Sequence, residues 1–183
     1  MSIPPTDTTI RTVSIIEQVV TSVGPWSRLA IAERALRRAL ELAAPKGHTL
    51  DPITVAAIEG ILDRARAARL TSPTETATPA ASPAPLLSIK AAQKPAESAL
   101  IGAGLALLQT IDATPRARTQ RAYDTACTTA AQHCIERTLP LVIPRLIESW
   151  TALRADARRL APFDPPHTPA QPPLTDQTLG PLW

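Results

Sequence analysis

Proline is the residue whose placement most constrains this chain, because a proline inside a helix removes a backbone hydrogen bond and clashes with the preceding turn. The sequence of 183 residues contains 20 prolines, and few of them fall inside stretches with helical periodicity. Most lie in residues 71–96, in residues 161–183 or just before an expected helix. This distribution predicts an all-α protein of two small modules, each of about three helices. A linker rich in proline, alanine and threonine joins the modules, and a disordered proline-rich tail follows them.

Apolar residues recur every three or four positions through the N-terminal module, residues 8–70. The first stripe, Val13–Val23, is compatible with a helix or a strand, because its β-branched residues have low helix propensity. Pro25 and the pair Asp51–Pro52 are typical helix starts, with proline at the first helical position. The buried faces expected for the second and third helices are Leu29, Ala32, Leu36, Leu40 and Ala43, and Val55, Ile58, Leu62 and Ala65.

The C-terminal module, residues 97–160, shows a similar periodicity. Thr114–Pro115 predicts the start of its second helix, Leu139–Pro140 the end of that helix, and Pro144 the start of the last one. The expected apolar stripes are Leu100, Gly104, Leu108 and Ile111; Tyr123, Cys127, Ala130 and Cys134; and Ile147, Trp150, Leu153, Ala157 and Leu160. The sequence leaves open whether the two modules pack as one bundle.

The composition favours a chain that associates with itself or with a partner. Hydrophobic residues make up 44% of the sequence, but aromatic residues only 3%, and many of the apolar residues are alanines that bury little surface. Each module alone therefore has a small core, which oligomerisation or a partner protein would complete. The net charge of +3 permits a nucleic-acid partner without requiring one.

Cysteine spacing and hydropathy predict a cytoplasmic protein. Cys127 and Cys134 are seven residues apart, which on one helix separates them by about 10.5 Å, too far for a disulfide. A reducing compartment is the simpler interpretation. The sequence shows neither a stretch of roughly 20 apolar residues that could span a bilayer nor a signal peptide, so we expect no membrane partner.

Residue patterns typical of enzymes are missing from the sequence. It contains no glycine-rich phosphate loop, no HExxH or CxxC motif and no nucleophile elbow. The three histidines, which stand in different contexts, are His48, His133 and His167. We therefore expect no catalytic activity, no cofactor, no metal site and no small-molecule substrate.

Arginine clusters are the candidates for a binding site, and position separates them. Two clusters lie at expected helix C-termini, where the helix dipole favours cations, and a third lies mid-helix and is expected to be a solvated face. These clusters are Arg64, Arg66 and Arg69; Arg154, Arg158 and Arg159; and Arg34, Arg37 and Arg38.

Arg116, Arg118 and Arg121 differ, because Thr114–Pro115 would place them in the first turns of a helix, where the dipole disfavours cations. They predict an anion or nucleic-acid site, unless Asp112 and Asp124 neutralise them.

The tail is the other candidate. Pro166, Pro169 and Pro172 recur every third residue, as in a polyproline helix, and Trp183 could anchor the tail on a partner.

Taken together, the sequence predicts a non-catalytic helical interaction or scaffold protein that acts through self-association or partner-helix packing. The alternative is a nucleic-acid-binding structural protein, of the coat or packaging type, that uses the cluster at Arg116.

Overall fold

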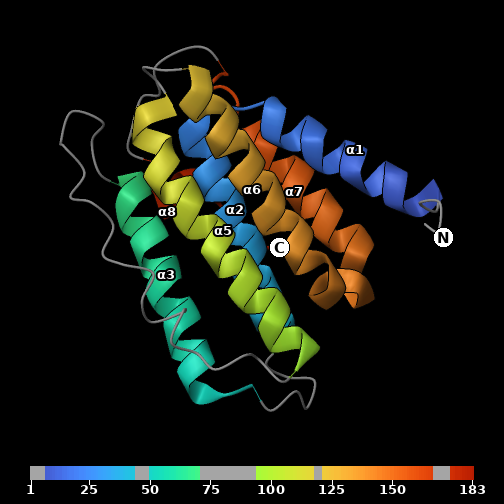
Figure 1. The fold of residues 1–183 in the computed structure, drawn as a ribbon. Coiled ribbons are helices and arrows are strands. Elements are labelled where there is room, and N and C mark those ends of the chain that lie inside the picture. The colour runs from blue at the N-terminus through green and yellow to red at the C-terminus, as the bar shows by residue number, and fades with distance from the viewer. Residues whose placement is uncertain (1–6, 44–49, 71–93, 118–120, 167–173) are drawn as a thin grey trace.

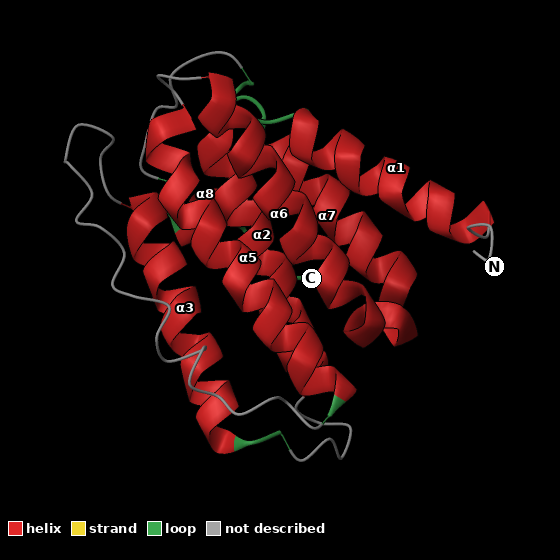
Figure 2. Cartoon of the chain, in the orientation of Figure 1, coloured by secondary structure: helices red, strands yellow, loops and turns green. Residues whose placement is uncertain are grey.

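The computed structural model of this chain describes residues 7–43, 50–70, 94–117, 121–166 and 174–183. Within these ranges it describes every side chain except those of residues 7–13, 115 and 116. All regular elements in the described residues are helical, which confirms the all-α prediction (Figure 2). The elements are α1 (Asp7–Thr21), α2 (Pro25–Ala43), α3 (Pro52–Leu70), α5 (Pro95–Ala117), α6 (Arg121–Val142), the 3₁₀ turn η1 (Ile143–Arg145), α7 (Leu146–Leu160) and α8 (Asp176–Leu179).

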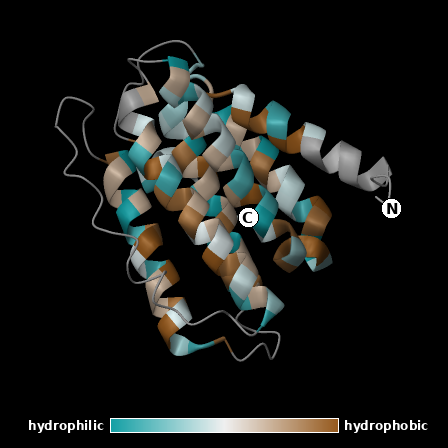
Figure 3. Ribbon diagram, viewed as in Figure 1, coloured by the Kyte–Doolittle hydropathy of each residue, from teal (hydrophilic) through white to brown (hydrophobic). Residues whose placement is uncertain are grey.

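The two expected modules pack as one bundle around α2 (Figure 1). Helix α2 contacts α3, α5, α6 and α7, so it touches elements from both halves of the chain. Most of its residues are buried, including Leu29, Ile31 and Leu36. A single apolar core runs through α1, α2, α3, α5, α6 and α7. Brown and teal turns alternate along the helices in Figure 3, as expected for amphipathic helices that share one core.

Several predicted helix boundaries are confirmed, and local chemistry explains them. The segment Val13–Val23 is helical up to Thr21, although the side chain of Val13 lies outside the described residues. Helices α2 and α3 begin at Pro25 and Pro52, as predicted. The carboxylate of Asp51 accepts a hydrogen bond from the backbone N–H of Ile53 at 3.3 Å, which makes it an N-terminal cap.

Two predicted boundaries in the C-terminal half are wrong, because prolines near helix ends are tolerated there. Helix α5 continues through Thr114–Pro115 to Ala117, and α6 continues past Pro140 to Val142. Only two residues of each helix follow its proline, so the backbone hydrogen bond that each proline removes lies close to the helix end. Burial holds those last turns in place, since Ala117 packs with Cys127, and Val142 is buried in the main core.

The prediction for the last long helix is confirmed in part. Leu153, Ala157 and Leu160 are buried, as expected. Ile147, however, is 80% exposed, and the prediction that it belongs to the buried stripe is wrong. The turn η1 separates α6 from α7, and the first turn of α7 lies at the margin of the bundle (Figure 1).

The C-terminal residues fold back onto the bundle, so the prediction of a disordered tail is wrong for residues 174–183. Leu174 and Leu179 are buried among the helices. Thr175 caps α8 by accepting a hydrogen bond from the N–H of Thr178 at 3.2 Å. Gly180 has a φ of 67°, a left-handed conformation that suits glycine. We call residues 174–183 the C-terminal strap.

The remaining predictions about the tail and the linker fall largely on residues that are not described. Pro166 is half-buried after the last turn of α7, whereas Pro169 and Pro172 lie outside the described residues. The linker was expected at 71–96, and its residues 71–93 are likewise outside the description.

Candidate functional site at the C-terminal strap

Two buried arginines of α2, Arg34 and Arg38, contact the strap. Arg34 and Arg38 are 6% and 1% exposed, so the prediction that they form a solvated face is wrong. Both pair with the carboxylate of Asp156 on α7, at 3.0 Å from Nε of Arg34 and 2.5 Å from Nη2 of Arg38. A charge can be buried at acceptable free energy only when it is paired and hydrogen-bonded. Asp156 pairs with both arginines and accepts a hydrogen bond from Arg38, while Arg34 donates its hydrogen bonds to carbonyls of the strap.

A buried arginine of α3, Arg69, contacts both α2 and the strap. Arg69 donates from Nε to Glu33 at 2.7 Å, from Nη1 to the carbonyl of Leu174 and from Nη2 to Asp176. Arg66, one turn earlier on α3, bonds the other carboxylate oxygen of Asp176. Helix-dipole stabilisation at the end of α3 therefore does not account for Arg69, whose role is to connect three elements.

Arginines also bind the backbone of the strap beyond α8. Arg34 donates to the carbonyls of Gly180 and Pro181, and Arg38 donates to the carbonyl of Leu182 at 2.6 Å. Arg159 on α7 donates to the carbonyl of Leu179. Backbone carbonyls are present in any peptide, so these contacts depend on the path of the strap backbone, a helical turn followed by residues 180–182, more than on its side chains.

Trp183 ends the strap on the surface of α2. Its indole Nε1 donates to Glu41 at 2.9 Å. The guanidinium of Arg145 lies 4.3 Å from the centre of its ring, and that of Arg38 lies 5.9 Å away. Cations at these distances from an indole ring are attracted to its π face. The predicted anchoring role of Trp183 is therefore filled inside the chain, and whether it also anchors on a partner stays a prediction.

A cavity of about 210 Å³ lies beside these contacts, between α2, α3 and the strap. Its charged lining consists of four arginines and two carboxylates: Arg34, Arg37, Arg66, Arg69, Glu33 and Asp176. Four positive and two negative groups leave two positive charges on its wall. Arg37, Arg66 and Asp176 are the exposed members, with 39%, 51% and 55% of their side-chain surface accessible. We call this space the arginine cavity.

Charge and burial shift the pKa values of three groups around the cavity in ways that follow from their contacts. Burial lowers the pKa of Arg38, and the nearby Asp156 opposes that shift. Burial also acts against the charge of Arg69, but hydrogen bonding to Glu33 and to Asp176 outweighs it, and the pKa is raised. Hydrogen bonding from Arg69 lowers the pKa of Asp176. Asp176 is therefore a carboxylate near neutral pH.

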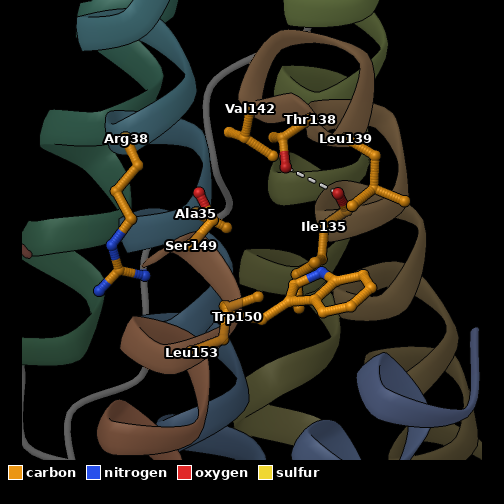
Figure 4. A pocket seen from close by; sticks show the side chains of 9 residues that line it. All are labelled: Ala35, Arg38, Ile135, Thr138, Leu139, Val142, Ser149, Trp150 and Leu153. Carbon is orange, nitrogen blue, oxygen red and sulfur yellow. Dashed lines mark hydrogen bonds between the residues drawn. The ribbon is translucent and has the colours of Figure 1, made fainter. Parts of the chain in front are cut away.

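A second cavity, between α2, α6 and α7, has a volume of only about 10 Å³ (Figure 4). Nη1 of Arg38, Oγ of Ser149 and Nε1 of Trp150 are buried there without a hydrogen-bond partner among the described residues. The hydroxyl of Thr138 is satisfied, since it donates to the carbonyl of Ile135 at 2.7 Å. A space of this size holds about one water molecule and excludes an organic ligand.

The arginines predicted to form an anion site do not share one helix. Arg116 lies in the last turn of α5, and Arg121 is the exposed first residue of α6, while Arg118 and the side chain of Arg116 are outside the described residues. The helix dipole therefore disfavours a cation at Arg121 but favours one at Arg116. Asp124, a predicted neutralising group, pairs instead with the buried Arg28 at 2.5 Å. Whether this cluster binds an anion stays a prediction.

The two cysteines lie inside the bundle, away from the arginine cavity. Cys127 and Cys134 are free and fully buried, and burial raises the pKa of Cys127 to about 11 and also raises that of Cys134. In the described part of the chain, no three histidine, cysteine or carboxylate side chains are grouped so that they could hold a metal ion. No helix among those residues has both the length and the apolar character needed to cross a bilayer.

The chain matches no protein-family model, no curated protein and no solved structure. The sequence of α2 gives no signal for the site, because Glu33, Arg37 and Glu41 lie next to or one turn from Arg34 or Arg38, as on a solvated helix face.

Proposed function

We propose that this chain is a non-catalytic interaction protein whose strap-binding surface accepts an acidic peptide segment of a partner protein. One observation carries the proposal: this surface already holds a peptide, the chain's own strap. Arg34, Arg38, Arg69 and Arg159 bind strap carbonyls, and Arg66 and Arg69 bind the carboxylate of Asp176.

Both kinds of contact serve recognition of a segment from another chain. Bonds to backbone carbonyls supply affinity for a segment that adopts the backbone shape of the strap, a helical turn with the residues that follow it. A carboxylate held by two arginines supplies a preference for an acidic residue at one position. Leu174 and Leu179 add apolar anchors on either side of Asp176. A partner segment that presents leucine, an acidic residue and leucine at this spacing would make the same contacts.

The strap in its own chain competes with such a partner. A segment tethered to its binding surface acts at an effective concentration in the millimolar range, so a free peptide of the same sequence binds the intact chain only weakly. Loosening the strap is therefore expected to increase binding of a peptide added in trans.

The test uses a fluorescein-labelled peptide with the sequence of residues 173–183, titrated with the full chain and followed by fluorescence anisotropy. Asp176→Asn in the full chain removes the charged contact of the strap with Arg66 and Arg69, and we expect the variant to bind the peptide at least about tenfold more tightly than the unmodified chain. Gln177→Ala is the matched control, because Gln177 is an exposed neighbour on α8 and its replacement leaves the binding surface intact.

Trp183→Ala, which loosens the other end of the strap, provides a second variant. Circular dichroism establishes that each variant is folded before its titration. Absence of saturable peptide binding to both folded variants would overturn the proposal.

Self-association is supported by a different surface. Ile143 in η1 and Ile147 in α7, at the junction of α6 and α7, are 64% and 80% exposed. Exposed isoleucines are suited to packing against an apolar helix face, including that of a second copy.

A further inference from the structure

We infer that the acidic position of the binding surface selects a phosphorylated residue, so that a phosphate monoester of the partner segment takes the place of Asp176. The inference rests on the proposed function and specifies its ligand. It follows from three observations: the way Asp176 is held, the space beside it, and the charge of the arginine cavity.

Asp176 is held in a fork of two arginines. One carboxylate oxygen accepts from Nη2 of Arg69, and the other accepts from Nη2 of Arg66. Both oxygens of the Asp176 carboxylate are thus already bonded, and a carboxylate has no third oxygen that could project toward another arginine. A phosphate monoester presents three terminal oxygens and can satisfy two guanidinium groups while it bonds a third.

Space and a third arginine are both available next to Asp176. The arginine cavity of about 210 Å³ borders Asp176 and is lined on another side by Arg37. Arg37 pairs from Nη2 with Glu33 at 3.2 Å, and its side chain is partly exposed. A phosphate group projects further from the backbone than the short side chain of aspartate. It therefore extends into the cavity, where Arg37 can reach it.

The charge of the cavity favours a dianion over a carboxylate. Its lining carries four positive groups against the two carboxylates of Glu33 and Asp176, which leaves an excess of two. When a group of charge close to −2 replaces the single negative charge of Asp176, the excess falls to about one. Glu33 remains in place, because it is buried and paired with Arg69.

The size of the cavity argues against a larger free ligand. Pockets that enclose drug-sized molecules have volumes of about 300–1,000 Å³, so the arginine cavity suits a single phosphate group. The surrounding surface is covered by a peptide segment, the strap. A phosphate attached to a peptide therefore fits the whole site, with the phosphate in the arginine cavity and the peptide on the surface that binds the strap.

Three labelled peptides test the inference. Each has the sequence of residues 173–183, with aspartate, serine or phosphoserine at the position of Asp176, and each is titrated into the folded full-chain variants Asp176→Asn and Trp183→Ala. We expect the phosphoserine peptide to bind about tenfold or more tightly than the aspartate peptide, because a charge-assisted contact is added. The serine peptide should bind most weakly.

Arg37→Gln, introduced into each of the two hosts, identifies the source of the added affinity. We expect this variant to bring the phosphoserine peptide to the affinity of the aspartate peptide and to leave the aspartate peptide nearly unchanged. Arg154→Gln, an exposed arginine of α7 outside the cavity, is the matched control and should change neither affinity.

The outcomes separate the two proposals. If no peptide binds, the proposed function fails. If the aspartate peptide binds and phosphorylation adds nothing, or if Arg37→Gln has no selective effect, the phosphate inference is wrong while the proposed function stands. Competition with inorganic phosphate forms a third arm: displacement of the phosphoserine and aspartate peptides at the same phosphate concentration would indicate a site for free anions and would also overturn the inference.

Discussion

Nε of Arg69 on α3 lies 2.7 Å from the carboxylate of Glu33 on α2, and each of these side chains is only 2% exposed. The pair joins two helices of the N-terminal half and, through the other nitrogens of Arg69, the C-terminal strap. Interactions among residues far apart in the sequence thus converge on one buried guanidinium group. The stability of the bundle and the position of the strap are expected to depend on it.

Replacing Arg69 should be strongly destabilising. Arg69→Met leaves the buried Glu33 with only its pair to Arg37, and breaking a buried ion pair from one side lowers the free energy of unfolding by about 3–5 kcal/mol. Arg66→Met on the same helix is the control, because Arg66 is half-exposed and its pair should contribute under about 1 kcal/mol. Urea unfolding at neutral pH measures both. Equal effects of the two substitutions would contradict the assigned role of Arg69.

Docking of the strap should weaken in acid. Hydrogen bonding from Arg69 lowers the pKa of Asp176 below its unfolded value of about 3.9, so the stabilisation is fully present above that value. It is lost as the pH falls through the lower pKa of the docked carboxylate. Amide signals of residues 176–180 in ¹H–¹⁵N NMR spectra, followed from pH 7 downwards, should shift toward unfolded positions at the acid end. The Asp176→Asn variant should lack the change in these amide signals that protonation of residue 176 causes.

Asp164 should be required for the start of α2. Its buried carboxylate accepts a hydrogen bond from the N–H of Ser27 at 2.7 Å, and its carbonyl accepts one from the N–H of Gly24 at 2.6 Å. Asp164→Ala removes this cap and should lower the free energy of unfolding by about 1–2 kcal/mol. Asp63→Ala, an exposed carboxylate of α3, is the control and should have little effect.

A substitution at Gly24 tests the same contact between Asp164 and the start of α2. A side chain at this position would collide with the carboxylate and the carbonyl of Asp164, so Gly24→Ala is also expected to destabilise the chain. A neutral result in thermal unfolding would show that the end of α7 does not approach α2 so closely in solution.

Both cysteines should be unreactive in the folded protein. Burial raises the pKa of Cys127 to about 11, and Cys134 is completely buried and has a raised pKa, so little thiolate is present at pH 8. We expect no rapid reaction with Ellman's reagent in buffer and the reaction of two thiols per chain in denaturing urea. Fast modification of the native protein would contradict the burial of α6 against α2 and α5.

Self-association through the junction of α6 and α7 should depend on concentration. If Ile143 and Ile147 form the contact, sedimentation velocity will show a shift to larger species as the concentration rises. The double substitution Ile143→Ser, Ile147→Ser should abolish that shift. Ile53→Ser, at an isoleucine that is 69% exposed at the start of α3, serves as the control. Monomeric behaviour of the unmodified chain at high concentration would exclude this surface as a dimer contact.

For the described residues, local patterns in the sequence were sufficient to predict the helical class and the starts of α2 and α3. Periodicity and capping depend on residues a few positions apart, so both can be recognised from the sequence alone. The errors at Pro115 and Pro140 have a different cause. The residues that follow these prolines stay helical because Ala117 and Val142 are buried against other helices, which no local pattern reveals.

The candidate site lay beyond prediction for the same reason. Arg34, Arg38 and Arg69 have ordinary helical neighbours in the sequence, and nothing local distinguishes them from solvated arginines. Their partners, Asp156 and Asp176, are more than 100 positions away. The sequence by itself determined that this chain forms amphipathic helices with prolines at or beyond their ends. Only the tertiary structure decided which arginines are buried and that the strap lies on them, because a buried charge is stable only where the fold brings a carboxylate or a carbonyl to meet it.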